Sequence, residues 1–493
     1  MSLAYLLAFA SGFIALSHEI LWYRVYSYTS QGGAEAFALM LGAYLAGIAF
    51  GAYGARVLCR DGAPLLRAVA WLLAASSLAF FLPPAVASAV VLVESWELTL
   101  PAVAAASALL GAVFPLVGHS FIAPDARSGS RISYLYLANI LGSVAGSLGT
   151  GFLLLDHWPL ATVAWFLACA SLACAASLAA ARGVRGAALA GALAACVLGA
   201  VALRALGPAL YGSLYEKLQF KSGYRPGEHF ALTIENKSGV ITVDKDGTVY
   251  GGGIFDGTIN TSLQNDTNAI VRAYVLAGMH PAPREVMMVG LSSGSWANVI
   301  ADHPLVERLT IVEINPGYLK LVERYPEEAA LLRHPKVRIE IDDARRWLVR
   351  HSDRRFDLVI ANNTFHWRAH MSNLLSVEFA ELVRSRLRPG GVYYFNATGS
   401  PRAAASAAAV FPHLIGFHNC IAASSAPLAF DRERWTGVMR RYVVAGRSAL
   451  GGDADERAVL GRIDKLLQSE SQLRARIAHA APITDDNMGS EWR

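Results

Sequence analysis

The chain has 493 residues, of which 54% are hydrophobic and only 16% charged, and its mean hydropathy is +0.36. This composition is too apolar for an ordinary soluble protein. The net charge of +5 is spread along the chain without a dense block of Lys or Arg, so nucleic-acid binding is not indicated.

The first 211 residues form the apolar part of the chain, and we predict that they are a transmembrane helical bundle. A helix that spans a bilayer needs about 20 apolar residues. The third candidate stretch contains Pro83 and Pro84 and is predicted to be one kinked or partly interfacial helix, with two short passes as the alternative. Seven stretches have the required length: 3–23, 37–55, 66–94, 99–122, 132–155, 159–180 and 186–206.

Glycines recur at helical spacing in the second and fifth stretches. Gly47 and Gly51 lie four residues apart, as do Gly142 and Gly146. Small residues at this spacing let helix backbones approach closely in lipid. Packing within one bundle is the favoured interpretation, and a homodimer interface is the alternative.

Residues 212–283 are predicted to form a β-hairpin module. The segment "GVITVDKDGTVYGGG" has two β-rich runs on either side of Asp244-Lys245-Asp246-Gly247. Glycine at the end of this turn can adopt a positive φ at low cost.

From residue 284 to residue 447, strands alternate with helices, which is typical of a Rossmann-like α/β domain with a parallel sheet. Residues 448–493 are predicted to be one charged helix, "DERAVLGRIDKLLQSESQLRARIAHA", followed by an extended tail. The predicted strands are "EVMMVGL", "RLTIVEI", "VRIEIDDA", "FDLVIAN" and "GGVYYFNAT".

Residues that suit a nucleoside ligand follow the first three of these strands. The segment from Gly290 to Gly294 follows the first strand, where glycines let the backbone approach a ligand, although Ser292 replaces the central glycine of a GxGxG pattern. Glu313 ends the second strand, where an acidic residue can accept hydrogen bonds from ribose hydroxyls, and Asp343 follows the third.

These segments resemble the spermidine synthase (polyamine aminopropyltransferase) family, which has the class I S-adenosylmethionine-dependent transferase fold. The apolar half looks like the integral-membrane branch of that family, through "SGFIALSHEILWYR" and "YLANILGSVAGSLGTGFLLL". The segments that carry the resemblance in the second half are "FDGTIN", "MMVGLSSGS", "IVEINPGYL", "IDDARRWL", "FDLVIAN", "LLSVEFAELVRSRLRPGGV" and "ITDDN".

The resemblance implies a role in polyamine biosynthesis, with S-adenosylmethionine or its decarboxylated form as co-substrate. Glu313 matches the acidic residue that holds the ribose, and Asp343 matches the one near the adenine amino group. Gly290, Ser292 and Gly294 correspond to the loop at the nucleoside and sulfonium. On the acceptor side, Asp256 matches an Asp-Gly pair, and Asn260 stands where the family has Gln.

The largest departure is Asn362, which ends the fourth strand where the family has Asp. A carboxylate there can orient an ammonium group and help to remove its proton, which is worth roughly 10²–10⁴-fold in rate. Asn cannot accept a proton at neutral pH. His366 and His370 follow in "TFHWRAH" and can supply a base, whereas Arg368 favours an anionic acceptor group.

We therefore predict Asn362, His366 and His370 as catalytic residues and no metal site, because two histidines alone are a poor ligand set. The predicted substrate-binding residues are Asp256, Asn260, Asn363 and Arg368.

Three functions stay open at this point. The first is a membrane-anchored transferase that moves an aminopropyl-type group to an amine or an atypical, anionic acceptor. The second is a membrane-bound S-adenosylmethionine-dependent methyltransferase. The third is a catalytically degenerate protein that binds a ligand or is linked to transport.

The expected location is the inner membrane, with several spans in the lipid bilayer. Arginines gather in the loops at 56–67, 119–131 and 181–185, and the positive-inside rule places these loops in the cytoplasm. Seven spans then put the second half of the chain outside. A co-substrate made in the cytosol favours the other side, so the orientation is left open.

Overall fold

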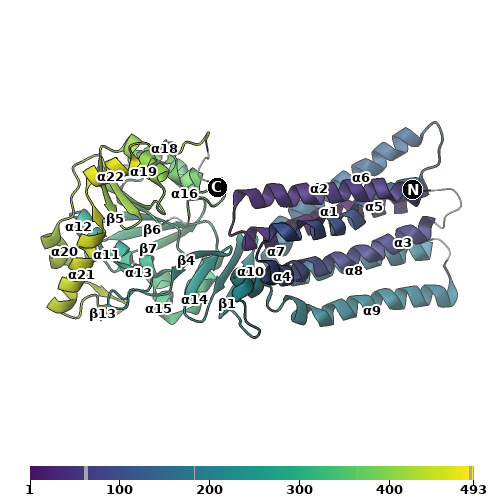
Figure 1. Ribbon diagram of the computed structural model, residues 1–493, viewed down its shortest axis with the longest axis horizontal. Coiled ribbons are helices and arrows are strands. Elements are labelled where there is room, and N and C mark those ends of the chain that lie inside the picture. The colour runs from purple at the N-terminus through teal and green to yellow at the C-terminus, as the bar shows by residue number, and fades with distance from the viewer. Residues whose placement is uncertain (60–64, 182–183, 363–364, 488–490, 492–493) are drawn as a thin grey trace. The chain divides into compact units, whose positions relative to one another are not determined.

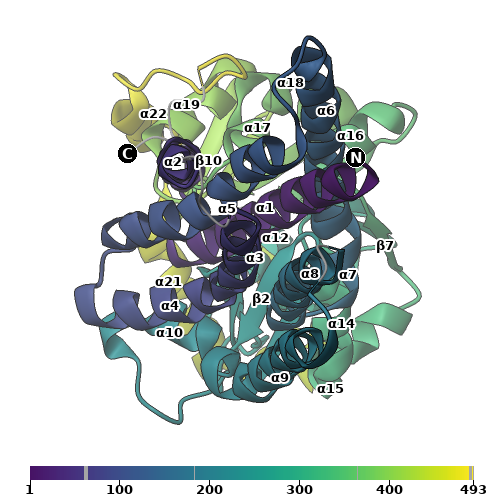
Figure 2. The ribbon, with the colours of Figure 1, turned by 90° about the vertical axis from the view of Figure 1, so that its right-hand side faces the viewer.

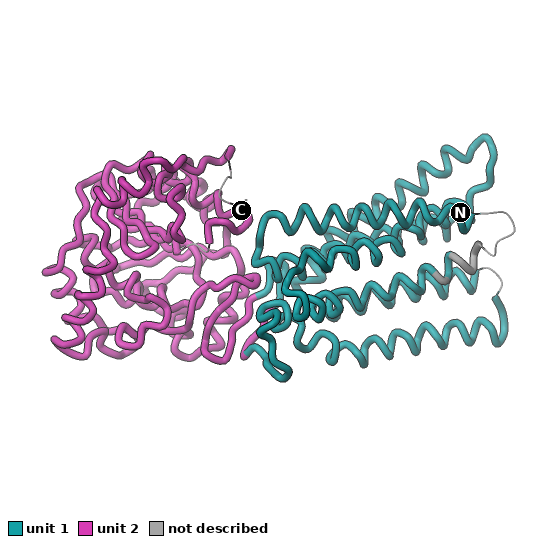
Figure 3. The backbone as a smooth tube through the Cα atoms, viewed as in Figure 1, with its two compact units in different colours: residues 1–230, 235–240 teal, residues 231–234, 241–493 magenta. Residues whose placement is uncertain are grey.

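The protein is described by a computed structural model that divides into two compact units (Figure 3). Unit 1 comprises residues 1–230 and 235–240, and unit 2 comprises residues 231–234 and 241–493. The described residues are 1–59, 65–181, 184–362, 365–487 and 491, with the side chains of 65–68 and 71 excepted.

Unit 1 is helical, and its long helices run alongside one another (Figure 1, Figure 2). Seven helical segments of the described chain are long and apolar enough to cross a membrane: Ser2–Thr29, Ala34–Val57, Leu72–Val93, Glu97–Phe121, Ser128–His157, Leu160–Ala181 and Gly186–Gly223. Each overlaps one of the seven predicted stretches.

The helices of unit 1 are α1 (Ser2–Thr29), α2 (Ala34–Gly54), α3 (Leu65–Ser76), α4 (Leu82–Val93), α5 (Leu100–Phe121), α6 (Ser128–Leu148), α7 (Leu155–His157), α8 (Leu160–Ala181), α9 (Gly186–Tyr211) and α10 (Leu214–Phe220). The predicted kink lies between α3 and α4, which a 3₁₀ turn at Ser77–Phe81 separates. Pro83 and Pro84 fall in the first turn of α4, where a missing backbone N–H costs nothing.

Glycines bring two pairs of these helices into backbone contact. A Cβ atom built on Gly51 of α2 would lie 1.9 Å from the carbonyl oxygen of Ala108 in α5. A Cβ atom on Gly142 of α6 would lie 1.9 Å from the carbonyl oxygen of Phe9 in α1. The same holds at Gly47 and Gly146, so these glycine faces pack within the chain, as the favoured interpretation predicted.

The segment 235–240 belongs to unit 1, although residues on both sides of it belong to unit 2. Glu235 accepts hydrogen bonds from the Leu160 backbone N–H (2.9 Å) and from the Tyr215 hydroxyl (2.8 Å). Burial raises the pKa of Glu235, and these donors and Arg24 partly offset that effect. Val240 packs in the helical core.

A four-stranded sheet follows, with the order β1-β2-β3-β4. Its strands are β1 (Leu232–Asn236), β2 (Gly239–Val243), β3 (Thr248–Gly251) and β4 (Ile254–Thr258). The predicted turn joins β2 to β3, with Gly247 at a φ of 78° and Asp244 accepting hydrogen bonds from the backbone of Asp246 and Thr248. The predicted hairpin is therefore the centre of a larger sheet.

The large sheet of unit 2 has eight strands in the order β14-β10-β11-β9-β8-β5-β6-β7. The five strands from β9 to β7 are parallel, as predicted, whereas β11, β10 and β14 are antiparallel and were not predicted. Its strands are β5 (Glu285–Val289), β6 (Arg308–Glu313), β7 (Val337–Ile341), β8 (Phe356–Ala361), β9 (Leu387–Asn396), β10 (His413–Phe417), β11 (Cys420–Ser424) and β14 (Leu467–Gln468).

Helices cover both faces of this sheet, because its central strands are apolar on both sides. Met288 and Ile360 belong to one core cluster, whereas Met287 and Val359 belong to the other. The first cluster includes residues of α13 (Ser295–Ala301), α14 (Gly317–Arg324), α20 (Arg432–Met439) and α21 (Asp453–Leu466); the second includes residues of α16 (Ala344–Arg350), α18 (Val377–Arg386), α19 (Pro401–Val410) and α22 (Glu470–Ile477). The short elements of unit 2 are α11 (Val271–Tyr274), α12 (Leu276–Met279), α15 (Pro326–Ala329), α17 (Ser372–Leu375), β12 (Val443–Val444) and β13 (Arg447–Ser448).

The single C-terminal helix that we predicted is wrong, because the segment forms two helices. Leu467 and Gln468 form β14, which pairs with β10 and interrupts the helix. Ser469 then begins α22 with a capping box that includes Gln472.

We predict that Gly51→Ala destabilises the protein by about 1–3 kcal/mol, because the added methyl group would overlap the backbone of α5. Gly42→Ala is the matched control on the same helix, since a Cβ atom there meets nothing within 4 Å. Thermal unfolding of both variants in detergent measures the difference. Equal Tm values for the two variants would contradict the proposed packing of α2 on α5.

Candidate functional site

The loop between β5 and α13 leaves open space at the carboxyl end of the sheet. Gly290, Ser292 and Gly294 all have positive φ values, of 85°, 51° and 87°. A Cβ atom built on Gly290 would meet nothing within 4 Å, whereas one on Gly294 would crowd Val322 and Glu328 at 3.1 Å. Strand β5 lies between β6 and β8, at the switch point where ligands bind in open α/β sheets.

Glu313, at the end of β6, ties this loop to the sheet. Its carboxylate accepts hydrogen bonds from the backbone N–H groups of Leu291 and Asn315, both at 2.7 Å. The side chain is buried, and burial raises its pKa to about 7 even though these N–H groups act in the opposite direction. The carboxylate therefore exchanges a proton near neutral pH.

Asp343 follows β7 and begins helix α16. Its side chain accepts a hydrogen bond of 2.8 Å from the backbone N–H of Arg346, as the N-cap of that helix. The neighbouring Asp342 accepts hydrogen bonds from the guanidinium groups of Arg346 and Arg350. Asp343 thus lies at the end of the next strand along the sheet from Glu313.

A cavity of about 430 Å³ opens in unit 2 and has the size of a small-molecule site. The predicted residues Asp256 and Asn362 line it together with Arg272. Four asparagines contribute to its wall, namely Asn268, Asn362, Asn396 and Asn419.

Asp256 connects the cavity to the glycine loop. The Ser292 hydroxyl donates a hydrogen bond to the backbone carbonyl of Asp256, and the Tyr318 hydroxyl donates one to its carboxylate at 2.5 Å. Burial raises the pKa of Asp256, and the Tyr318 hydrogen bond and the charge of Arg368 partly offset this shift. The predicted nucleoside loop is therefore hydrogen-bonded to a residue of the cavity wall.

Asn362 contacts a second amide at the ends of β8 and β9. Its side-chain oxygen accepts a hydrogen bond of 3.4 Å from the Asn396 amide, whose own oxygen accepts one from the Thr398 backbone. The predicted substrate-binding residue Asn363 lies outside the described residues.

The two predicted histidines have different environments. The backbone N–H and the ring of His366 bond to the hydroxyl of Thr398, which lines the cavity. His370 is exposed, has a φ of 70° and does not line the cavity. The described part of this segment forms turns rather than a helix, so their spacing does not place them on one helix face.

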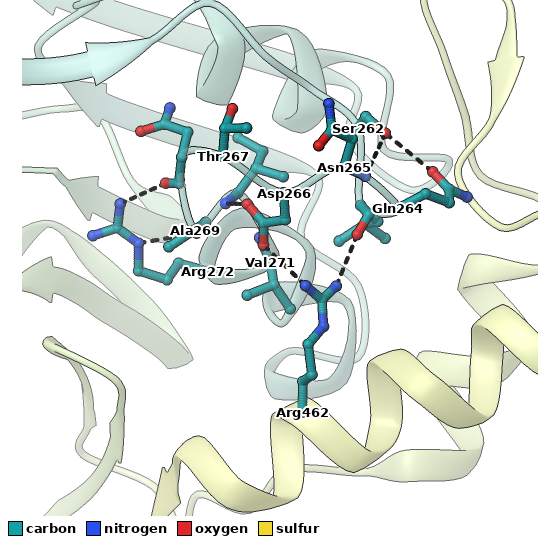
Figure 4. Close-up of polar contacts among 12 residues, drawn as sticks. Ser262, Gln264, Asn265, Asp266, Thr267, Ala269, Val271, Arg272 and Arg462 are labelled. Carbon is teal, nitrogen blue, oxygen red and sulfur yellow. Dashed lines mark hydrogen bonds and ion pairs between the residues drawn. The ribbon is translucent and has the colours of Figure 1, made fainter. Parts of the chain in front are cut away.

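Asn260 organises a loop beside the cavity and does not line it. Its amide donates to the Asn265 carbonyl (2.5 Å) and the Thr267 hydroxyl (2.8 Å), and its oxygen accepts from the Ser262 backbone. Ser262, Asn265 and Thr267 are labelled in Figure 4, together with Arg272 at the end of the same segment.

Sequence reasoning missed Arg272 and other polar residues that line the cavity, including Asn268, Asn396, Thr398, His418 and Asn419. Arg272 had a detectable signal, because it is the lone charge in the run "NAIVRAYVL". His418 and Asn419 join β10 to β11, two strands that were not predicted. In the described parts of the chain, no group of three or more His, Cys, Asp or Glu side chains could hold a metal ion.

Residues 273–405 match the family described as the spermine/spermidine synthase domain. The polyamine aminopropyltransferase of Desulforudis audaxviator is 29% identical over 177 residues, which cover 34% of this chain and 64% of that protein. The spermidine synthase of Dictyostelium discoideum is 30% identical over 114 residues, or 23% of this chain and 39% of that protein.

Among solved structures, spermidine synthase from Thermotoga maritima shares 16% identity, with a TM-score of 0.37 and coverage of 51% of this chain and 86% of that chain. The alignments span 39–64% of the length of the two curated relatives named above. Residues 273–405 thus match the spermine/spermidine synthase domain, and this part of the chain is similar to polyamine aminopropyltransferases.

Proposed function

We propose that unit 2 is a transferase that binds S-adenosylmethionine or its decarboxylated form and moves an aminopropyl-type group to an amine or an atypical acceptor. One observation carries the proposal. The spermine/spermidine synthase match covers the strand ends at which the Gly290 loop, Glu313 and Asp343 lie.

These strand ends suit the nucleoside of a sulfonium donor. Open space at Gly290 lets a ligand approach the backbone, and each oxygen of the Glu313 carboxylate retains capacity to accept a ribose hydroxyl. Asp343 can accept from the adenine amino group at the end of the adjacent strand. The donor's sulfonium substituents would then extend toward the cavity, which the Ser292–Asp256 contact joins to the loop.

The acceptor side of the cavity does not suit a polyamine dication. Asn362 and Asn396 supply amides where a carboxylate would attract an ammonium group. Transfer requires that the acceptor attack the carbon next to sulfur while the carbon–sulfur bond breaks and methylthioadenosine leaves. His366, linked to the cavity through Thr398, is our proposed base for the acceptor's proton.

Methyl transfer is the second candidate, because the nucleoside residues are common to both reactions and the cavity lacks the amine-directed carboxylate at position 362. In both cases we propose that the seven long apolar helices of unit 1 anchor the enzyme in a membrane. The orientation stays open, because the positive-inside count favours the outside for unit 2 and the supply of co-substrate favours the cytoplasm.

We predict that the purified full-length protein binds methylthioadenosine in isothermal titration calorimetry and that Glu313→Ala weakens binding at least about tenfold, because buried charge-assisted hydrogen bonds are lost. The matched control is Glu340→Ala in β7, whose carboxylate pairs with Arg338 at the surface. Mass spectrometry identifies the reaction: methylthioadenosine indicates aminopropyl-type transfer and S-adenosylhomocysteine indicates methyl transfer. Failure to bind methylthioadenosine and either sulfonium donor would contradict the proposed function.

We predict that methylthioadenosine binding strengthens as pH rises through about 7, the pKa of Glu313. Ionised Glu313 accepts ribose hydroxyls more strongly than the protonated acid, a gain of about fivefold in affinity. The free energy of unfolding has the opposite pH dependence, because the pKa of Glu313 is about 7 in the folded protein and 4.5 in the unfolded chain. The protonated carboxyl group therefore stabilises the fold fully below pH 4.5, and this contribution is lost as the pH rises through about 7. Calorimetry across this range should show the rise in the wild type and a flat profile in Glu313→Gln; a flat wild-type profile would refute the assignment.

We predict that Asn362→Asp confers or increases putrescine turnover by roughly 10²–10⁴-fold, because it restores a carboxylate that can orient the amine and accept its proton. Asn396→Asp is the control, since it places the same charge on the neighbouring strand at the partner amide. Turnover is measured as methylthioadenosine release from decarboxylated S-adenosylmethionine. Equal, low turnover in both variants would show that position 362 does not determine acceptor choice.

A further inference from the structure

Arg272 is a buried cation without a carboxylate partner in the described structure. It is 8% exposed, lies on the short helix α11 and lines the cavity. Its guanidinium donates to the carbonyl oxygen of Ala269 at 3.0 Å (Figure 4). It also donates to the carbonyl oxygen of Asn268 and to the side-chain oxygen of Asn419, both at 3.0 Å. All three acceptors are uncharged. A buried charge is costly unless it is paired, so this position suits an anionic group on a ligand.

The surroundings of Arg272 place it next to the proposed donor site. Its guanidinium lies 5.3 Å from the ring centre of Trp296, the second residue of the helix that follows the glycine loop. A Cβ atom on Gly257 would contact both Ser292 of that loop (3.2 Å) and Asn268 (3.6 Å). Gly257 therefore lies between the loop and Asn268, whose carbonyl oxygen accepts a hydrogen bond from Arg272.

One buried polar group close to Arg272 also lacks a hydrogen-bond partner in the described structure. It is the indole N–H of Trp296, a residue that is 4% exposed. Its ring stacks 6.3 Å from that of Tyr394, whose hydroxyl is hydrogen-bonded to Cys420. Buried polar groups are normally hydrogen-bonded, so the indole N–H suits a polar ligand group or its bound water.

We propose that Arg272 binds the α-carboxylate of S-adenosylmethionine, so that the donor is S-adenosylmethionine itself and not its decarboxylated form. The inference rests on the proposed function, since it concerns the donor of the same site. Asp256 lines the same cavity and is available to the α-ammonium group. Among the described residues of the wall, Asp256 and Arg272 carry the opposite charges that match the zwitterionic end of an amino acid, and His418 lies in the same wall.

The test compares both donors by calorimetry on the full-length protein. We expect the wild type to bind S-adenosylmethionine at least tenfold more tightly than the decarboxylated donor. Arg272→Gln should weaken S-adenosylmethionine binding at least tenfold and leave the decarboxylated donor within about twofold. Arg462→Gln is the matched control, because Arg462 reaches the same loop segment from α21, pairs with Asp266 and does not line the cavity (Figure 4).

A second variant keeps all hydrogen bonds of Arg272, and it therefore distinguishes an effect of charge on ligand binding from an effect on folding. Asn419→Asp is nearly isosteric and places a carboxylate against the guanidinium, where it competes with the ligand's carboxylate. It should weaken S-adenosylmethionine binding tenfold without weakening the decarboxylated donor. Equal binding of the two donors, or equal losses for both in the variants, would overturn the inference and assign Arg272 to the acceptor or to folding. Binding of neither donor would overturn the proposed function as well.

Discussion

The hydrogen bonds from two backbone N–H groups to the Glu313 carboxylate are the interaction on which the site depends. One of them comes from Leu291 in the glycine loop and the other from Asn315 after β6. A single buried side chain thus sets both the path of the loop and the start of the segment leading into α14. Because the group is buried, its charge is costly, and a ligand that donates hydrogen bonds to it recovers part of that cost. The glycine loop and Glu313 therefore act together as one structural unit of the site.

The strand ends on the two sides of β5 carry two chemically different groups of side chains. Glu313 and Asp343 carry carboxylates on one side of β5, whereas Asn362 and Asn396 carry amides on the other. A nucleoside offers donors such as hydroxyls and an amino group, which carboxylates accept. The amides can accept or donate, so they tolerate acceptors of several kinds but provide no full charge for a cation. The division separates the strand ends that we propose for the donor's nucleoside from those that we propose for the acceptor.

Much of this organisation could be predicted from the sequence, because it depends on local patterns. Seven apolar stretches of sufficient length and five alternating strand–helix units are visible in the chain, and the glycine spacing indicated close helix packing. The antiparallel strands β10 and β11 escaped prediction because their short apolar runs have no alternation that distinguishes them from buried helix. Leu467 and Gln468 lie in a sequence with helical character, and only pairing with β10 makes them a strand. Arg272 was missed because its significance depends on tertiary structure: it is buried at a cavity and, among the described residues, has no carboxylate partner.

Residues 235–240, which connect β1 to β2, affect how the chain can be divided into its two units. The chain passes between the two compact units three times, at residues 230/231, 234/235 and 240/241. A cut at any one of these points leaves one unit without part of its own packing. Cutting before residue 241 removes β1 and the first two residues of β2 from the small sheet. Cutting after residue 230 separates Tyr215 and Leu160 from Glu235. No single point in the chain separates the two units, because residues 231–240 belong partly to each. An evolutionary insertion, exchange or loss of either unit would therefore have to include residues 231–240 as well.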